Sequence, residues 1–169
     1  MPDIKIVYSG SLRTKATHIQ SGDTIITDAP TDNNGKGEAF SPTDLFASSL
    51  GSCMLTIMGI TAQTHGLNIK GSTVHINKTM GTNPRRVSSL DITIDINGIL
   101  NAKDKRILIK AAKHCPVSKS IHPDIKEEIV GSAEIQEIFK VSKIGKVAGS
   151  KVINGEIINN LNARLIRDG

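Results

Sequence analysis

Apolar and polar residues alternate along several short segments of the chain, with the period of two that is typical of strands with one buried face. Isoleucine, valine and leucine carry most of the apolar positions, and these residues favour sheet. The pattern predicts strands over residues 3–9, 11–18, 23–28, 72–79 and 87–96, with a further strand near 125–130.

A helical period replaces this alternation over residues 41–66. Ser41 can cap the helix, and Asp44 stands where the acid of a capping box reaches back. No charged residue lies between Asp44 and His65, which predicts a mostly buried helix, and Gly66 is a natural stop. Its many serines and threonines make the segment too polar for a membrane span.

A second helix is expected over residues 102–114 and is ended by Pro116, with Cys115 at that end. The loop over residues 29–40 is polar, and its Gly-x-Gly at 35–37 is interpreted as flexibility, because no further glycines follow at phosphate-binding spacing. The resulting order, β-β-β-α-β-β-α-β around a long central helix, predicts the α+β class.

Length and composition narrow the function classes. A chain of 169 residues is one domain, or one domain with an appendage, and with three Phe, one Tyr and no Trp its core depends on aliphatic residues. The net charge of +5 is mild and no basic run alternates with aromatic residues, so we expect no nucleic-acid partner. The N-terminal residues form no apolar leader, which favours a cytoplasmic location without membrane attachment.

The chain has two cysteines, Cys53 and Cys115, which are too few for a disulfide scaffold and should be reduced in the cytosol. No CxxC, HExxH or zinc-ligand spacing is present, so neither a metal nor a bound cofactor is expected. Small neighbours, Gly51 and Ser52, leave room beside the Cys53 sulfur. A thiol this far inside a helix needs a cation to ionise it, and Arg13 is the candidate. The simpler alternatives are a core cysteine and a solvent-facing arginine.

Three motifs together resemble the osmotically inducible protein C and organic hydroperoxide resistance family over residues 3–125. They are SPTDLFASSLGSCMLTIM around Cys53, CPVSKSIHPD from Cys115, and the N-terminal strand with Arg13. The resemblance implies an intertwined homodimer with active sites at the subunit interface. It also implies that Cys53 is the peroxidatic thiolate, that Cys115 resolves its sulfenic acid into an intramolecular disulfide, and that Arg13 pairs with the thiolate. The substrate would be a small-molecule peroxide, and the reductant an external dithiol.

One position departs from the hydroperoxide-resistance branch, which places a glutamate ten residues before the first cysteine to hold the arginine. That position is Thr43 here, so the efficiency of a peroxidase depends on a replacement. Asp44 is one candidate, although capping alone would explain it, and Glu38 in the preceding loop is another.

After residue 125 the sequence changes character and resembles part of a β-barrel domain of bacterial translation initiation factor two. The matching stretch is AEIQEIFKVSKIGKVAG with the later RLIRDG, and Asn154-Gly155 is expected to form a hairpin turn. We therefore predict two domains, residues 1–130 and a strand-rich tail over 131–169, with residues 126–130 completing the sheet of the first.

Taken together, the sequence predicts a cysteine-based peroxidase that acts in oxidative stress defence. Two other classes stay open: a non-catalytic module of the same fold that holds a small apolar ligand near Cys53, and a translation-factor-like binding fragment attached to a carrier domain.

Overall fold

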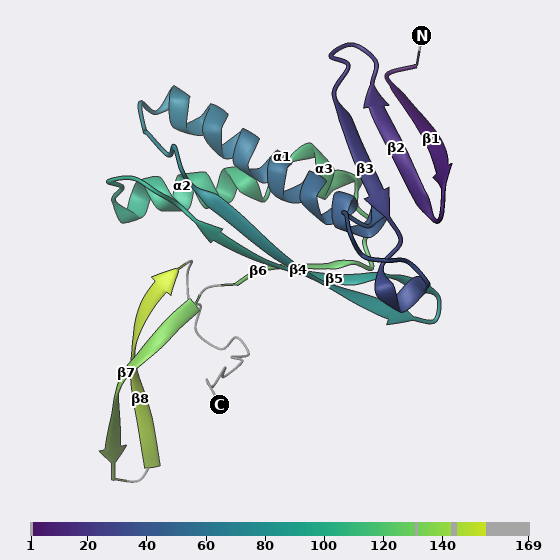
Figure 1. Ribbon diagram of the computed structural model, residues 1–169. Coiled ribbons are helices and arrows are strands. Elements are labelled where there is room, and N and C mark those ends of the chain that lie inside the picture. The colour runs from purple at the N-terminus through teal and green to yellow at the C-terminus, as the bar shows by residue number, and fades with distance from the viewer. Residues whose placement is uncertain (1, 131, 143–144, 155–169) are drawn as a thin grey trace. The chain divides into compact units, whose positions relative to one another are not determined.

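The computed structural model describes residues 2–130, 132–142 and 145–154 (Figure 1). The chain divides into two compact units, Met1–Leu50 and Gly51–Gly169, which are described separately below. The element order confirms the predicted α+β class and the predicted sequence β-β-β-α-β-β-α-β. A 3-10 turn, η1 (Thr31–Asn33), and a short helix, α3, are additions that the sequence did not predict.

The N-terminal unit contains an antiparallel meander of three strands, β1 (Ile4–Gly10), β2 (Arg13–His18) and β3 (Thr24–Asp28). The first turn centres on Ser11 and Leu12, whereas the predicted strands 3–9 and 11–18 placed it at residue 10. Both turn residues have positive φ angles, 51° and 61°, which is the backbone of the tight hairpin turns that match strand twist. The apolar side chains of β1 are largely exposed on this sheet.

Helix α1 (Pro42–Thr64) starts in the N-terminal unit and continues into the second. Its start is the predicted capping box: the Asp44 N–H donates to Ser41 Oγ at 3.1 Å, and the Ser41 N–H donates to the Asp44 carboxylate at 2.8 Å. Gly66, just beyond the helix, has a φ of 66°, as a glycine stop requires.

The prediction of a mostly buried helix holds for one stripe of α1 only. The buried positions, which recur every three or four residues, are Ala47, Leu50, Gly51, Met54, Met58 and Ala62. By length and composition α1 could also cross a membrane, since an 18-residue window has a mean hydropathy of 1.6. Core helices of soluble proteins have the same length and composition.

The second unit is built on a sheet of three strands, β4 (Thr73–Thr82), β5 (Arg85–Asp95) and β6 (Lys126–Ile129). β4 and β5 form the predicted hairpin, and β6 pairs with β5 in parallel, which confirms that residues 126–130 complete the sheet. The second part of α1 and helix α2 (Ala102–Ala112) lie against this sheet (Figure 1). The buried core side chains of these elements are Met54, Met58, Ala62, Val87, Leu90, Ile92, Ile94, Leu108 and Ala112.

Two local predictions need correction in this unit. Helix α2 ends at Ala112, before the predicted end at residue 114, and Pro116 does not end it. Instead, Pro116 occupies the first turn of a separate helix, α3 (Pro116–Ser120), because its missing N–H and fixed φ suit that position.

The tail contains a two-stranded antiparallel hairpin, β7 (Ser132–Val141) and β8 (Gly145–Asn154). This confirms the expectation of strands. The hairpin turn expected at Asn154-Gly155 lies partly outside the described residues, and Asn154 is the last residue of β8. The domain boundary between residues 130 and 131 stays a prediction.

Candidate thiol site and arginine network

Cys53 lies in the middle of α1 and is half-buried. The sequence suggested that Gly51 leaves room for the Cys53 sulfur, but in the structure Gly51 faces other residues. A Cβ on Gly51 would instead stand 3.1 Å from Ile76 Cδ1 and 3.3 Å from Val74 Cγ1. The glycine therefore lets the backbone of α1 approach β4 closely, two residues before Cys53.

Cys115 lies at the junction between α2 and α3 and is fully buried. It is the N-cap residue of α3, with an extended backbone (φ −67°, ψ 144°). Its Sγ accepts a hydrogen bond from the Ser118 backbone N–H at 3.3 Å, in the way that a serine or aspartate oxygen usually caps a helix. The sulfur is therefore held in one direction by the first turn of α3.

The two thiols meet within the second unit. Both cysteines are free, and Cys53 is close enough to hydrogen-bond with the Cys115 thiol. Burial raises the pKa of Cys115, and the neighbouring Cys53 raises it further, while the Ser118 N–H acts in the opposite direction. Two cysteines with 61 residues between them in the sequence are thus brought together, as the sequence-based hypothesis required.

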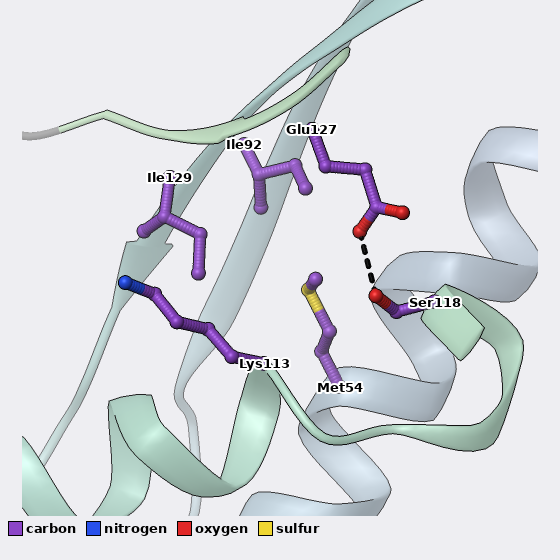
Figure 2. A pocket seen from close by; sticks show the side chains of 6 residues that line it. All are labelled: Met54, Ile92, Lys113, Ser118, Glu127 and Ile129. Atoms are coloured by element: carbon purple, nitrogen blue, oxygen red, sulfur yellow. Dashed lines mark hydrogen bonds between the residues drawn. The ribbon is translucent and has the colours of Figure 1, made fainter. Parts of the chain in front are cut away.

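A cavity of about 360 Å³ opens beside Met54, the residue that follows Cys53 (Figure 2). Met54 from α1 and Ile92 from β5 face each other across it, and Lys113 lies towards one end. At the other end the Ser118 hydroxyl donates to the Glu127 carboxylate at 2.8 Å, which joins α3 to β6. Sequence reasoning did not single out Ser118 or Glu127.

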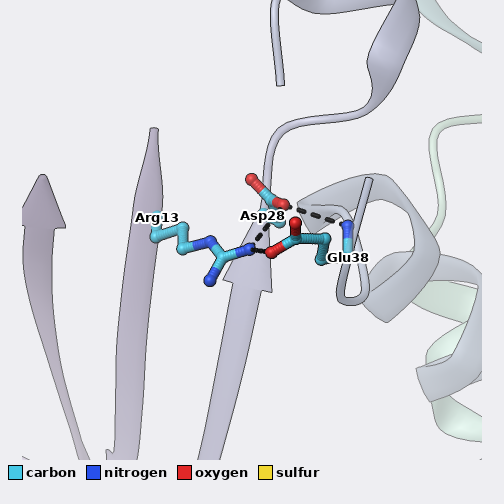
Figure 3. A network of polar contacts seen from close by, with 3 residues as sticks. All are labelled: Arg13, Asp28 and Glu38. Carbon is cyan, nitrogen blue, oxygen red and sulfur yellow. Dashed lines mark hydrogen bonds and ion pairs between the residues drawn. The ribbon is translucent and has the colours of Figure 1, made fainter. Parts of the chain in front are cut away.

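Arg13 belongs to the N-terminal unit, where two carboxylates hold it (Figure 3). Its Nη2 donates to Asp28 Oδ2 at 3.2 Å and also contacts the Glu38 carboxylate. These two hydrogen bonds, first that to Glu38, raise the pKa of Arg13 and so keep the guanidinium charged. Of the two acids proposed from sequence to hold the arginine, Glu38 does so.

Asp28 is fully buried and was missed from the sequence. Its Oδ2 also accepts the Glu38 backbone N–H at 3.0 Å, and this bond, together with Arg13, lowers the pKa of Asp28 despite its burial. A signal was available: in the β2–β3 pairing Arg13 stands directly opposite Asp28, a register that the predicted strands and their turn already imply.

The loop that carries Glu38 is tightly folded, which corrects the interpretation of its glycines as flexibility. The N–H of Gly35 donates to the Pro30 carbonyl at 3.0 Å, and the N–H of Gly37 to the Ala29 carbonyl at 3.2 Å. A Cβ on Gly35 would overlap the backbone of Ala29, and Gly37 has a φ of 66°. Glycine at both positions allows the close turn that brings Glu38 to Arg13.

Asp44 takes part in the capping box of α1, and Thr43 Oγ1 lies 3.0 Å from Ser41 Oγ. The contacts of both residues described here are therefore those of a helix start. Among the described residues, no group of three His, Cys, Asp or Glu side chains is arranged to hold a metal ion.

The tail and the remainder of the chain resemble different proteins. Over 53 residues the chain is 57% identical to translation initiation factor IF-2 of Pelagibacter ubique, and over 47 residues 53% identical to that of Flavobacterium johnsoniae. These matches cover 31% and 28% of this chain but only 7% and 5% of the factors, so the chain spans a small fraction of their length.

Solved structures resemble the part that precedes the tail. A protein of Psychrobacter arcticus, whose name refers to osmotic stress induction and a detoxification response, is 53% identical, with a TM-score of 0.74 over 77% of this chain and 95% of that one. An organic hydroperoxide resistance protein of Legionella pneumophila shares the fold at 16% identity and a TM-score of 0.61, over 75% and 92% of the two chains. One of Vibrio cholerae, with captopril bound in one of its active sites, has a TM-score of 0.60 at 16% identity, over 76% and 90%.

The family model described as OsmC-like protein matches residues 35–130, a range that includes both cysteines, Glu38 and β6. This match and the Psychrobacter relative agree in sequence, and the organic hydroperoxide resistance proteins share the fold. The chain belongs to the OsmC-like protein family.

Proposed function

We propose that this protein is a cytoplasmic, cysteine-based peroxidase that reduces small organic or inorganic hydroperoxides in oxidative stress defence. The observation that supports it best is the meeting of Cys53 and Cys115, one half-buried on α1 and the other buried at the start of α3. A peroxidatic thiol must be reached by substrate, and a resolving thiol must be within reach of the first.

The proposed reaction has two steps on the protein. The Cys53 thiolate attacks one peroxide oxygen, the O–O bond breaks, and the leaving alkoxide takes up a proton as an alcohol, so that Cys53 becomes a sulfenic acid. The Cys115 thiolate then attacks the Cys53 sulfur, and hydroxide leaves and is protonated to water as the disulfide forms. An external dithiol reduces this disulfide by two successive exchanges and is itself oxidised.

Arg13 is proposed as the cation that keeps the Cys53 thiolate charged and polarises the peroxide. Its own environment supports this role, because a guanidinium that lies between two carboxylates stays charged and has few orientations open to it. In this proposal Glu38 replaces the family glutamate whose position is Thr43, and Asp28 is a second, buried anchor. Asp44 caps the start of α1.

The protein is also proposed to work as an intertwined homodimer, as the family resemblance implies. The large exposed apolar side chains on one face of β1, namely Ile4, Ile6 and Tyr8, support this. A three-stranded sheet with such a face is stabilised by a second layer, which another copy of the chain would supply.

Counting free thiols tests the proposal. The protein is treated with cumene hydroperoxide, and its thiols are then counted by alkylation and mass spectrometry. We expect a Cys53–Cys115 disulfide in the wild type and none in Cys53→Ser. Two untouched thiols would contradict the peroxidase and favour the non-catalytic module that binds a small ligand. Co-sedimentation with ribosomes, which we do not expect, would favour the translation-factor-like fragment.

A further inference from the structure

We infer that Ser118 and Glu127 anchor the turn that carries Cys115 to the sheet, and so act as positioning residues for the Cys53–Cys115 disulfide. This inference rests on the proposed function for its chemical consequence. Its structural part, an anchor that holds a buried thiol in place, can be tested without any peroxide.

The turn that carries Cys115 cannot hold its own shape. Helix α3 has five residues, which is less than two turns, and so short a helix gains too few internal hydrogen bonds to be stable alone. Its position must therefore come from contacts with its surroundings.

Ser118 connects this turn in two directions. Its backbone N–H donates to the Cys115 sulfur at 3.3 Å, and its side-chain hydroxyl donates to Glu127 Oε2 at 2.8 Å (Figure 2). The second bond is charge-assisted and only partly exposed, which makes it the stronger kind of side-chain hydrogen bond. A chain of two hydrogen bonds thus connects the thiol to a carboxylate on another element.

Glu127 provides a fixed end for this chain because β6 is held by the sheet. It pairs with Leu90 in the parallel β5–β6 ladder, and Val130, just after the strand, donates its N–H to the Ile92 carbonyl at 2.8 Å. Leu90 and Ile92 are fully buried, so β5 belongs to the core of the unit. The core sheet therefore fixes the position of Glu127, and Glu127 fixes the position of the Cys115 sulfur through Ser118.

The consequence for the chemistry concerns the second step alone. A resolving thiol must be deprotonated and correctly aimed to attack the sulfenic acid. The Ser118 N–H contributes to both, since it lowers the pKa of a buried thiol and fixes the direction of its sulfur. The first step, at Cys53, does not use this anchor.

The test separates the two steps in the full chain. Each variant is oxidised with one equivalent of cumene hydroperoxide and quenched at short times, and intact mass then distinguishes trapped sulfenic acid from disulfide. We expect Ser118→Ala and Glu127→Ala each to slow disulfide formation by about tenfold, the order expected from losing a hydrogen bond to a charged group, with Cys53 oxidation unchanged. The double variant should be no slower than either single one, because both remove the same contact.

Matched variants distinguish positioning from general damage. Ser118→Thr keeps a hydroxyl and should restore most of the rate. Ser120→Ala, on the same helix, and Glu128→Ala, the exposed neighbour on β6, should match the wild type. Unchanged disulfide formation in Ser118→Ala and Glu127→Ala would overturn the inference.

A second readout needs no peroxidase activity. In the reduced protein, alkylation of the buried Cys115 by iodoacetamide requires the turn to open. We expect alkylation to be about tenfold faster in Ser118→Ala and Glu127→Ala than in their control variants, by the same reasoning. If the wild type forms no sulfenic acid but Cys115 is alkylated faster in Ser118→Ala and Glu127→Ala than in the controls, the proposed function is wrong and the inferred anchor is supported. If alkylation is equal in all variants, the anchor is wrong.

Discussion

Arg13 is held by two carboxylates of different character. Asp28 is fully buried on β3, whereas the Glu38 side chain is 58% exposed and comes from a loop. Because a buried acid has few other partners available, Asp28 suits a fixed anchor. Glu38 has water as an alternative partner, so in the proposed reaction it would give up part of its contact to a thiolate or peroxide that binds the guanidinium.

This difference leads to a prediction for the peroxide reaction at Cys53. Arg13→Met should lower its second-order rate by about 10²-fold, because a charged donor is lost from the reacting centre. Glu38→Gln should lower it by roughly tenfold or less, since an oxygen acceptor remains and only the charge is lost. Stopped-flow oxidation of Cys53 measures both rates. Equal activity in Arg13→Met and the wild type would remove Arg13 from the mechanism.

Asp28 should also make stability depend on pH in the acid range. Its pKa is lowered in the folded protein, so the folded state favours the carboxylate. The resulting stability is fully present above the unfolded pKa of about 3.9 and is lost as the pH falls through the lower folded value. Urea unfolding of Asp28→Asn should therefore show a lower midpoint than the wild type at pH 7, and the gap should narrow below pH 4. A gap of constant size would contradict this.

At the scale of elements, the sequence predicted best where local signals decide the structure. The capping box of Ser41 and Asp44, the stop at Gly66 and the alternation of β5 were all read correctly, since each depends on neighbours in the chain. Thiol proximity was anticipated only through the family resemblance.

The predictions that failed concern residues whose roles depend on partners far away in the sequence. The roles of Gly35 and Gly51 depend on Ala29 and on β4, partners that no local pattern reveals. Cys115 was placed at the end of α2 because Pro116 was taken as a helix stop, although proline suits a helix start equally well. Glu127 was missed because its partner is on a helix the sequence did not predict.

The close approach of α1 to β4 gives a prediction with a matched control on the same helix. Gly51→Leu should destabilise the protein by roughly 1–3 kcal/mol, because its side chain would collide with Ile76 and Val74. Gly59→Leu should be neutral or stabilising by up to about 1 kcal/mol, since no atom lies within 4 Å of a Cβ there and leucine favours helix. Chemical denaturation of the two variants provides the comparison, and similar losses in both would contradict the packing argument.

At the scale of the whole molecule, the chain joins an OsmC-like domain to a hairpin in the tail, which resembles part of translation initiation factor IF-2. The family model ends at residue 130, where β6 closes its sheet. In β7 and β8 several apolar side chains are exposed, among them Ile138, Phe139 and Val147. A two-stranded hairpin alone is marginally stable, and the matched stretch is at most a small part of a factor, so we expect the thiol chemistry to be independent of it.

Truncation after Val130 tests this independence. The fragment of residues 1–130 should form the Cys53–Cys115 disulfide at a rate within about twofold of the full chain, because all the residues assigned here to the chemistry precede the cut. Intact mass after peroxide treatment gives the rate. Loss of activity in a fragment that retains its circular dichroism would show that the tail contributes to the site, and the predicted boundary would then be wrong.

The proposed homodimer can be tested through the face of β1 that carries Ile4, Ile6 and Tyr8. Ile6 is 65% exposed on a single chain and Tyr8 likewise, so covering this face would remove much apolar surface from water. Sedimentation velocity at micromolar concentration should give twice the 18.1 kDa of one chain. Ile6→Glu should shift the protein to monomer, because a charge buried in an apolar interface is unpaired.

Lys5→Glu provides the control. It introduces the same carboxylate as Ile6→Glu, but residue 5 points to the opposite face of the strand. We expect this variant to remain dimeric. A wild type that sediments as a monomer would contradict the dimer outright. Dissociation by Lys5→Glu but not by Ile6→Glu would place the interface on the other face of β1, because successive side chains of a strand cannot share one side of the sheet.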